Sequence, residues 1–345
     1  MTRRAGLAFA AVGSVLAFAG GAGSQTVDSP SHYLVVAALA PNFAAQPEIV
    51  DATGAIERKV GTATHAQSWQ AGWSPDRSQI AWIDDAGVHV ERADGSDARL
   101  VVPRGAAPCR DLCVAMSFAW SPDGARLLVG GAGTNTRRLV VADLSSSAVR
   151  SLVRPRPYVE YRVVGWSVRG IAYLRYAGNP GTASCCRSEL YVARADGRKP
   201  RRLFAAAEPI HDTPYARWSP DGRSIAFVTE ARDPHDPRVA VVDVATRVVR
   251  RLRAVRQVMT VEPAWSPDSA RVAFARGGSV AVVSRRGRGV RVLKVRGDMV
   301  AWSPSGELAI VCGQRAVCIS AHGTAPPALR FRLPAGQAIL SIDPA

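Results

Sequence analysis

Residues 118–130 read FAWSPDGARLLVG, and residues 216–228 read ARWSPDGRSIAFV. Both stretches place Trp-Ser-Pro-Asp-Gly directly before a short apolar run. Proline at the second position of a turn presets φ, and glycine at the fourth position tolerates a positive φ. The phrase therefore predicts a tight turn between two strands, with the tryptophan as a large buried anchor at the end of the first strand.

The Trp-Ser pair recurs through the chain at intervals of roughly 37 to 52 residues. It begins at Trp73, Trp120, Trp166, Trp218, Trp265 and Trp302. Two copies lack the Asp, since Val168 and Arg169 replace Pro and Asp in one, and Ser305 replaces Asp in the other. A repeat of this length is the mark of a repeat architecture.

A second pattern follows each apolar run. Residues 88–102 (VHVERADGSDARLVV) and 190–204 (LYVARADGRKPRRLF) both read as a strand, a polar turn, and a strand rich in arginine. Each unit is then four antiparallel strands, a to d, with the arginines on an exposed outer strand. Four-stranded units at this period predict an all-β fold, a β-propeller built of four-stranded antiparallel blades.

The two ends of the chain predict how the ring closes. Six full units run from about residue 67 to residue 333. Residues 32–60 resemble strands b, c and d, and residues 336–343 (GQAILSID) resemble a lone strand a. Joined, they make a seventh blade shared between the termini. We favour seven blades, with six as the alternative.

The repeated phrase resembles the TolB-like family of WD-type propeller repeats, over about residues 32–345. The resemblance implies a rigid ring that binds a partner at one face, and for TolB itself a peptidoglycan-associated partner in the cell envelope. TolB-like propellers usually have six blades, and TolB carries a second domain ahead of its propeller. Seven blades, and an N-terminus without that domain, are expected departures.

The N-terminus predicts export. Arg3 and Arg4 precede an Ala/Gly/Val/Leu stretch, and Ala17-Phe18-Ala19 has small residues at cleavage-site spacing. This layout is typical of a secretory signal peptide. We assign residues 1–24 to the signal and 25–345 to a single propeller domain, exported to the periplasm, cell surface or exterior. An uncleaved anchor is the alternative, and the choice between Sec and twin-arginine export stays open.

Export makes disulfides the default state of the six cysteines. The sequences CRDLC and CGQRAVC each predict a local bridge, namely Cys109–Cys113 and Cys312–Cys318. Cys185 and Cys186 are adjacent, and a strained vicinal bridge between them is less certain. A zinc site is the rival interpretation, but none of the spacings is Cys-x-x-Cys.

The net charge is +16, and nearly all of it comes from arginine. A strong basic balance fits an acidic partner such as a cell-wall polymer, whereas a bias toward arginine codons explains it without a partner. The basic residues are spread along the chain, and no RNA-binding motif is present. We expect a protein or cell-wall partner, no nucleic acid, and no transmembrane span once the signal is cleaved.

Enzyme motifs are missing from the sequence. It has no Gly-x-Ser-x-Gly, no phosphate-binding loop and no His-Glu-x-x-His. Asp233, His235 and Asp236 sit in the segment RDPHDPR, which a solvated b–c hairpin tip explains as well as a metal site would. We predict no catalytic residue, no metal site and no cofactor.

One set of polar residues precedes strand a in several units: His65, Glu160, His211, Asp212, Glu262 and Asp298. Equivalent positions of a propeller converge near its axis, so these residues are candidates for a ligand-binding mouth. Independent turn-capping residues are the alternative. The predicted function is an exported, non-catalytic binding or scaffold propeller of the cell envelope. A hydrolase or lyase acting at the axial mouth is the second hypothesis.

Overall fold

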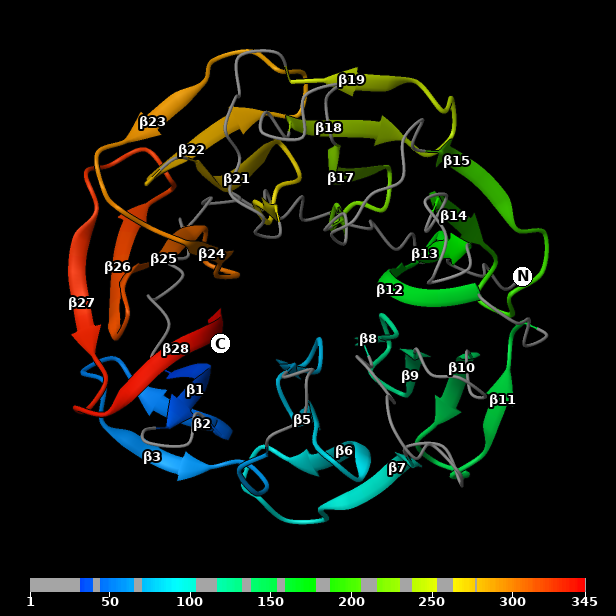
Figure 1. The fold of residues 1–345 in the computed structure, drawn as a ribbon, viewed down its shortest axis with the longest axis horizontal. Coiled ribbons are helices and arrows are strands. Elements are labelled where there is room, and N and C mark those ends of the chain that lie inside the picture. The colour runs from blue at the N-terminus through cyan, green and yellow to red at the C-terminus, as the bar shows by residue number, and fades with distance from the viewer. Residues whose placement is uncertain are drawn as a thin grey trace, which may run out of the picture.

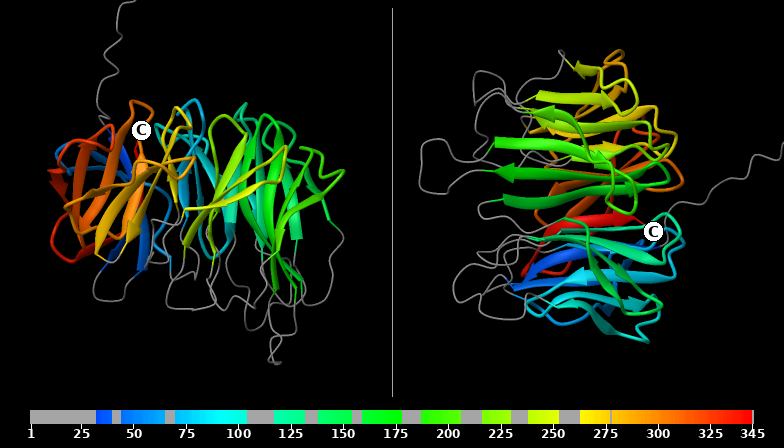
Figure 2. Two further views of the ribbon diagram at one scale, coloured as in Figure 1. Left: turned by 90° about the horizontal axis from the view of Figure 1, so that it is seen from above. Right: turned by 90° about the vertical axis from the view of Figure 1, so that its right-hand side faces the viewer.

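The fold is a ring of seven four-stranded antiparallel sheets, as predicted (Figure 1). The structure is a computed structural model. It describes residues 32–39, 44–64, 70–103, 117–131, 138–153, 159–177, 187–205, 216–229, 238–252, 263–276 and 278–344. Each sheet is one blade, with strand a nearest the axis and strand d at the rim (Figures 1 and 2).

The blades follow one another in sequence around the ring. The strands of blades 1 to 4 are, in sheet order, β28(Gln337–Pro344), β1(His32–Leu39), β2(Ala44–Asp51), β3(Ile56–Lys59); β4(Ala71–Trp73), β5(Gln79–Ile83), β6(Gly87–Arg92), β7(Arg99–Pro103); β8(Ser117–Trp120), β9(Arg126–Gly131), β10(Arg138–Asp143), β11(Val149–Ser151); and β12(Val159–Ser167), β13(Gly170–Ala177), β14(Arg187–Ala193), β15(Arg201–Ala205). Those of blades 5 to 7 are β16(Ala216–Trp218), β17(Ser224–Thr229), β18(Arg238–Asp243), β19(Val249–Arg251); β20(Ala264–Trp265), β21(Arg271–Arg276), β22(Ser279–Ser284), β23(Arg291–Leu293); and β24(Met299–Trp302), β25(Glu307–Gly313), β26(Ala316–Ala321), β27(Ala328–Arg332).

Blade 1 joins the two ends of the chain, and this confirms the predicted closure. The C-terminal strand β28 pairs antiparallel with β1, from Tyr33 opposite Pro344 to Leu39 opposite Gln337. Strands β2 and β3 complete the sheet. The first and last described strands are therefore hydrogen-bonded neighbours.

The hydrophobic core lies between the blades. Seven clusters of buried apolar residues occur in the described part of the chain, and each joins two neighbouring blades. In β17, Ile225 and Phe227 pack toward blade 4, while Ala226 packs toward blade 6. Both faces of the sheet are covered, so its strands are continuous apolar runs rather than alternating ones.

Five Ser-Pro turns join strands a to strands b in the predicted way. In each turn the amide of the fourth residue donates to the serine carbonyl at 2.8–3.0 Å. That fourth residue has a positive φ, and Arg77 and Ser269 adopt it at 61° and 58° without being glycine. The turn geometry therefore tolerates the two copies that lack glycine there.

The serine hydroxyl is the buried centre of this turn. Ser266 is fully buried; its hydroxyl donates to Asp268 and accepts the amide of Arg271, at 2.5 and 2.9 Å. Ser219 makes the same pair of bonds with Asp221 and Ser224, at 2.6 and 3.0 Å. One hydroxyl thus forms a hydrogen bond within the turn and a second with the backbone amide of the first residue of strand b.

The copy without proline uses a shorter turn. Strand β12 ends at Ser167 and β13 begins at Gly170, so only Val168 and Arg169 connect them. Gly170 has φ of 130°, and a Cβ there would lie 2.2 Å from the carbonyl oxygen of Ala193. A two-residue hairpin that requires glycine replaces the Ser-Pro-Asp-Gly turn.

The tryptophans of the phrase link neighbouring blades. The indole of Trp120 donates to the carbonyl of Gly72 at 3.2 Å, and that of Trp265 donates to the carbonyl of Arg217 at 2.9 Å. These two rings are buried, whereas the other four are only half-buried. The predicted anchor is therefore buried in two copies and partly buried against the core clusters in the other four.

Arginines of the outer strands also bridge blades. Arg58 of β3 donates to the carbonyl of Ala93, Arg99 of β7 to that of Leu144, and Arg201 of β15 to that of Val244, at 2.6–3.1 Å. Each acceptor directly follows strand c of the next blade. The forked guanidinium can donate several bonds at once, so this part of the arginine excess holds the ring together.

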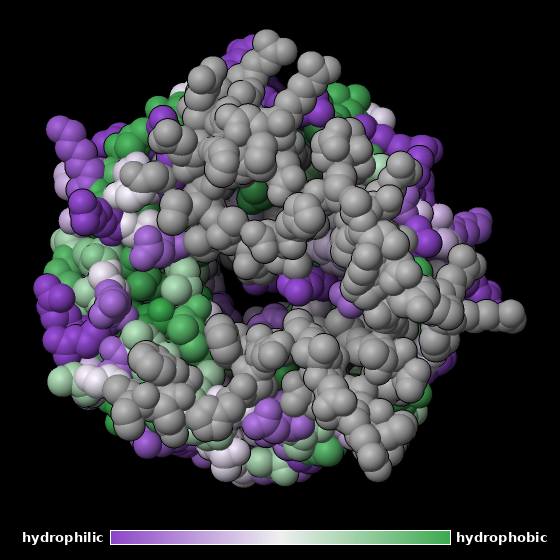
Figure 3. All heavy atoms as spheres, in the orientation of Figure 1, coloured by the Kyte–Doolittle hydropathy of each residue, from purple (hydrophilic) through white to green (hydrophobic). Residues whose placement is uncertain are grey.

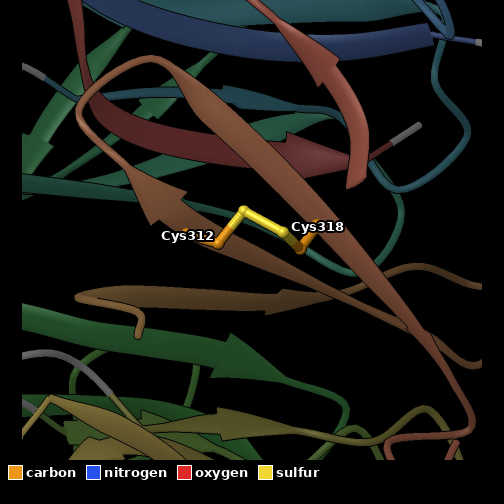
Figure 4. The surroundings of a disulfide bond; sticks show 2 residues. All are labelled: Cys312 and Cys318. Carbon is orange, nitrogen blue, oxygen red and sulfur yellow. A yellow bond between two sulfur atoms is a disulfide. The ribbon is translucent and has the colours of Figure 1, made fainter. Parts of the chain in front are cut away.

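Blade 7 carries the predicted disulfide between Cys312 and Cys318 (Figure 4). Cys312 lies on β25 and Cys318 on β26, and their Cα atoms are 5.8 Å apart. The bond crosses between the two strands of one hairpin. Cys109, Cys113, Cys185 and Cys186 lie outside the described residues.

Within the described ranges, no helix has the length and apolar character needed to cross a membrane.

Removing β28 should open the ring. A chain ending at Gly336 loses the strand that covers β1, together with Ile339 of the cluster between blades 7 and 1. We expect the melting temperature to fall by more than about 5 °C and the exposed edge to promote aggregation. Thermal scans with light scattering test this, and removal of Ala345 alone is the control. Equal melting and no aggregation would contradict closure through β28.

The serine turn should also be sensitive to single changes. Ser266→Ala removes the buried acceptor of the Arg271 amide, so we expect a loss of about 1–3 kcal/mol in unfolding free energy. Ser145→Ala is the control, because that exposed hydroxyl bonds Asp143 in solvent; it should cost under about 0.5 kcal/mol. Denaturant titration measures both, and equal losses would refute the role of burial.

Candidate functional site

The two faces of the ring differ in their connections. Strands a begin and strands b end at the face turned toward the viewer in Figures 1 and 3. Connections at this face include residues 104–116, 206–215 and 253–263, whereas a–b and c–d turns at the opposite face are short. Long connections on a rigid scaffold are where binding residues concentrate. We call this the mouth face.

Figure 3 shows a hollow at the centre of the mouth face. Hydrophilic side chains of described residues lie at its edge, and hydrophobic ones gather to its left.

Glu160 lies at the beginning of β12 on the mouth face. It is half-buried and stands opposite Tyr176 of β13. The next residue, Tyr161, is buried and packs edge-on against Tyr173 at 5.9 Å. The guanidinium of Arg162 lies 6.0 Å from the ring of Tyr176. Packing of its neighbours therefore fixes the backbone that carries Glu160.

Asp298 directly precedes β24 at the same face. It is exposed, and its amide donates to the carbonyl of Val311 at 3.2 Å. Strands β24 and β12 belong to blades 7 and 4, so three steps around the ring separate Asp298 from Glu160. The structure places both residues at the mouth face, on opposite sides of the ring.

The other four candidates lie outside the described residues. His65 falls in the connection from β3 to β4, His211 and Asp212 in that from β15 to β16, and Glu262 in that from β19 to β20. Asp233, His235 and Asp236 likewise fall outside them, in the connection from β17 to β18. In chain order, His65, His211, Asp212 and Glu262 each lie on a d-to-a connection, as predicted. In the described residues, no three His, Cys, Asp or Glu side chains group as metal ligands.

The aspartates of the repeated phrase serve the turns. The serine hydroxyl lowers the pKa of Asp76, Asp123 and Asp268, with further bonds from backbone amides. They remain ionised and hydrogen-bonded at the face opposite the mouth. Their repetition is structural, and we do not count them among the binding groups.

Sequence reasoning missed a buried acid in blade 1. Glu48 of β2 is fully buried, and Gln337 of β28 donates its amide to both carboxyl oxygens at 3.2 Å. Burial raises the pKa of Glu48, against the opposing effects of the Gln337 bond and of Lys59. A charged residue inside the apolar run AAQPEIV was the available signal.

A second missed group is the pair of His89 and Asp84 in blade 2. Their side chains meet at 2.9 Å, and Trp82 stacks on the imidazole with ring centres 5.1 Å apart. Asp84 also accepts the amides of Ala86 and Gly87 at 2.8 and 3.1 Å. The pair closes the b–c turn, which accounts for it without a ligand.

At the far end of the axis, the residue before each tryptophan is small in most blades. Gly72, Ala119, Gly165, Ala264 and Ala301 occupy this position, and Arg217 occupies it in blade 5.

Asp343 of β28 accepts the amide of Trp73 at 3.1 Å and pairs with Arg77 at 3.7 Å. This contact ties the closing strand to blade 2.

The sequence matches no protein-family profile and no curated protein. Solved structures are similar in fold. TolB from Acinetobacter baumannii matches with a TM-score of 0.51 and 17% identity, over 87% of this chain and 66% of that chain. The fold is a TolB-like propeller. The chain spans just under two thirds of the TolB structure, so the likeness concerns the propeller.

Two lyase structures resemble this TolB-like propeller as well. An oligogalacturonate lyase in complex with manganese matches with a TM-score of 0.58 and 12% identity, over 84% of this chain and 83% of that one. The oligogalacturonate lyase of Vibrio parahaemolyticus gives 0.56 and 8%, over 83% and 82%. At such identities the likeness shows the fold alone.

Glu48 should make the stability of the propeller depend on pH. A folded-state pKa above the ordinary value of 4.5 favours the protonated acid, so stability falls as pH rises from about 4.5 through the raised pKa. Glu48→Gln removes the buried charge and offers a donor to Gln337 Oε1, which has no partner. We expect the variant to melt higher than the parent at pH 8, with a smaller difference at pH 4.

The control is Glu57→Gln, since Glu57 is an exposed acid on the neighbouring strand β3. Melting scans across pH 4–8 measure both variants. A Glu48→Gln variant that melts below the parent at pH 8 would contradict a net destabilising effect of the buried carboxylate.

Proposed function

We propose that the chain is an exported, non-catalytic propeller that binds a protein or cell-wall partner at the mouth face. The supporting observation is positional: all six candidate residues belong to the starts of strands a or to the connections that lead into them. The opposite face carries short, repeated turns whose polar groups satisfy one another. The connections of the mouth face therefore differ from blade to blade more than the repeated turns of the opposite face do, and such differences could serve to recognise a partner.

Export is part of the proposal. The disulfide in blade 7 is the kind of bond that persists in an oxidising compartment. The first 24 residues have the order of a cleavable signal peptide, which leaves residues 25–345 as the mature propeller. The fold shared with TolB is compatible with an envelope location.

Charge gives the mouth its chemistry. Glu160, Asp212, Glu262 and Asp298 would add like charges to one funnel of a protein whose net charge is +16. Carboxylates that share a site raise one another's protonation cost unless a cation compensates. We infer that the mouth takes a basic group of the partner or a divalent cation.

A lyase or hydrolase at the mouth is the second candidate. It is favoured by the fold likeness to an oligogalacturonate lyase that was solved with manganese. His65, His211, Asp212 and Glu262 would then be the metal-ligand candidates, since imidazoles and carboxylates are common ligands of divalent metals.

A paired variant, Asp212→Ala with Glu262→Ala, tests the mouth. Cross-linking on intact cells followed by mass spectrometry should recover a partner with the parent and lose most of it with the variant. The control is His235→Ala, on a b–c connection, which should behave as the parent does. Equal capture by the paired variant, with loss in the control, would move the binding site to that connection.

The same variants separate the two functions. A binding protein gives partner capture and no turnover of oligogalacturonate in the presence of Mn²⁺. Manganese-dependent turnover by the parent, abolished in the paired variant, would replace the binding hypothesis with the lyase hypothesis.

A further inference from the structure

The rim of blades 5 and 6 concentrates positive charge on adjoining elements. Strand β19 and the turn before it carry three exposed arginines, and β23 and the turn before it carry three more. We call this set the basic rim: Arg247, Arg250, Arg251, Arg286, Arg288 and Arg291. Both strands are the last in their sheets, so one backbone edge of each has no strand neighbour in the sheet.

The two halves of the basic rim lie against each other. A Cβ on Gly287 would be 3.2 Å from a side-chain carbon of Leu252. Gly287 stands between Arg286 and Arg288, and Leu252 follows Arg251. Leu252 is fully buried in the cluster that joins blades 5 and 6. The packing of this one contact therefore brings arginines of both blades together, and Figure 1 shows β19 and β23 following one another along the rim.

Within the described residues, no acid pairs with most of these arginines. Residues 244–252 and 278–297 contain no Asp or Glu, and the described structure pairs none of Arg247, Arg251, Arg286, Arg288 and Arg291 with a carboxylate. Hydrogen bonds from the backbone amide and the hydroxyl of Thr246 lower the pKa of Asp243, and the charge of Arg250 adds a smaller effect in the same direction. Arginines on the outer strands of other blades do form ion pairs: Arg58 binds Glu91, and Arg202 binds Glu189 at 2.8 Å.

Clustered like charges without partners oppose folding through mutual repulsion. In the described structure, none of these six side chains makes the inter-blade bond that Arg58, Arg99 and Arg201 make. Apart from Arg250, these arginines have no hydrogen-bond or ion-pair partner for the guanidinium among the residues that the structure describes, and such forks match the oxygens of phosphate groups two at a time. The surface is therefore suited to a ligand that presents several anionic groups in a row.

We propose that the basic rim binds a linear anionic polymer with phosphodiester groups, as a second surface distinct from the mouth. The proposal rests on the proposed function only in taking the polymer to be one of the cell envelope. Arg250 and Arg251 of β19, Arg291 of β23 and the arginines of the turns before these strands lie on two neighbouring blades, so a polymer lying across the two blades would contact both sets. Its repeated phosphates would relieve the repulsion among the arginines.

Binding of purified mature protein to poly(glycerol phosphate) tests the proposal. The variant Arg251→Gln, Arg288→Gln, Arg291→Gln should bind at least about tenfold more weakly at low salt, because each charge near an anionic surface contributes on the order of fivefold. Affinity of the parent should fall steeply with added salt, and the variant should show a shallower dependence.

A matched variant removes the same charge elsewhere. Arg92→Gln, Arg169→Gln, Arg332→Gln changes three exposed arginines of blades 2, 4 and 7. It should bind the polymer within about twofold of the parent if the rim is the site, and equal weakening by both triple variants would overturn the proposal in favour of net charge alone. Stronger binding of the parent to phosphatidylglycerol vesicles than to the polymer would also overturn it.

Failure here and failure of the mouth hypothesis are distinguishable. The paired mouth variant keeps the basic rim intact, so it should retain polymer binding while losing its partner on cells. Thermal scans confirm that each variant is folded before its binding is compared.

Discussion

Each blade of this protein buries both of its faces against neighbouring blades, and that mutual covering is the constraint on which the structure depends. A single four-stranded sheet of this sequence would expose an apolar face on each side, so stability comes from the seven interfaces between sheets. An open array would leave two such faces uncovered. Pairing of β28 with β1 removes them, and Asp343 binds Trp73 of the next blade as part of the same closure.

The repeated Ser-Pro-Asp-Gly turn is the local device that makes these interfaces uniform. Its serine is buried and bonded on two sides, so it holds strand b at a fixed offset from strand a. The tryptophan beside it then reaches a carbonyl of the preceding blade in two of the copies. Because the polar groups of the phrase satisfy one another, the face that carries it is uniform, and the opposite face is free to vary.

The two surfaces that we propose for recognition differ in the charge of their side chains. The mouth candidates are mainly acidic and belong, in chain order, to the starts of strands a or to the connections before them, whereas the arginines of blades 5 and 6 stand at the rim. Most other outer arginines that the structure describes have a structural partner, such as the carbonyls bridged by Arg58, Arg99 and Arg201. The arginines that give the high net charge therefore fall into two groups. Some link neighbouring blades, and others form a local excess of positive charge on one side of the ring.

Local sequence predicted four strands in each unit, the position of every Ser-Pro turn, and the split blade at the termini, because each depends on turn chemistry and on a short apolar run; it favoured seven blades over six, and the structure has seven. It also predicted the Cys312–Cys318 bridge, whose partners are six residues apart. Tertiary structure decided what depends on distant segments. Glu48 and Gln337 meet across 289 residues, and Gly287 meets Leu252 across an interface between blades. The burial of the turn serines, and the partial exposure of four tryptophans, likewise depend on how closely the next blade packs. Local pattern specifies a blade, whereas contacts between blades exist only once the ring has closed.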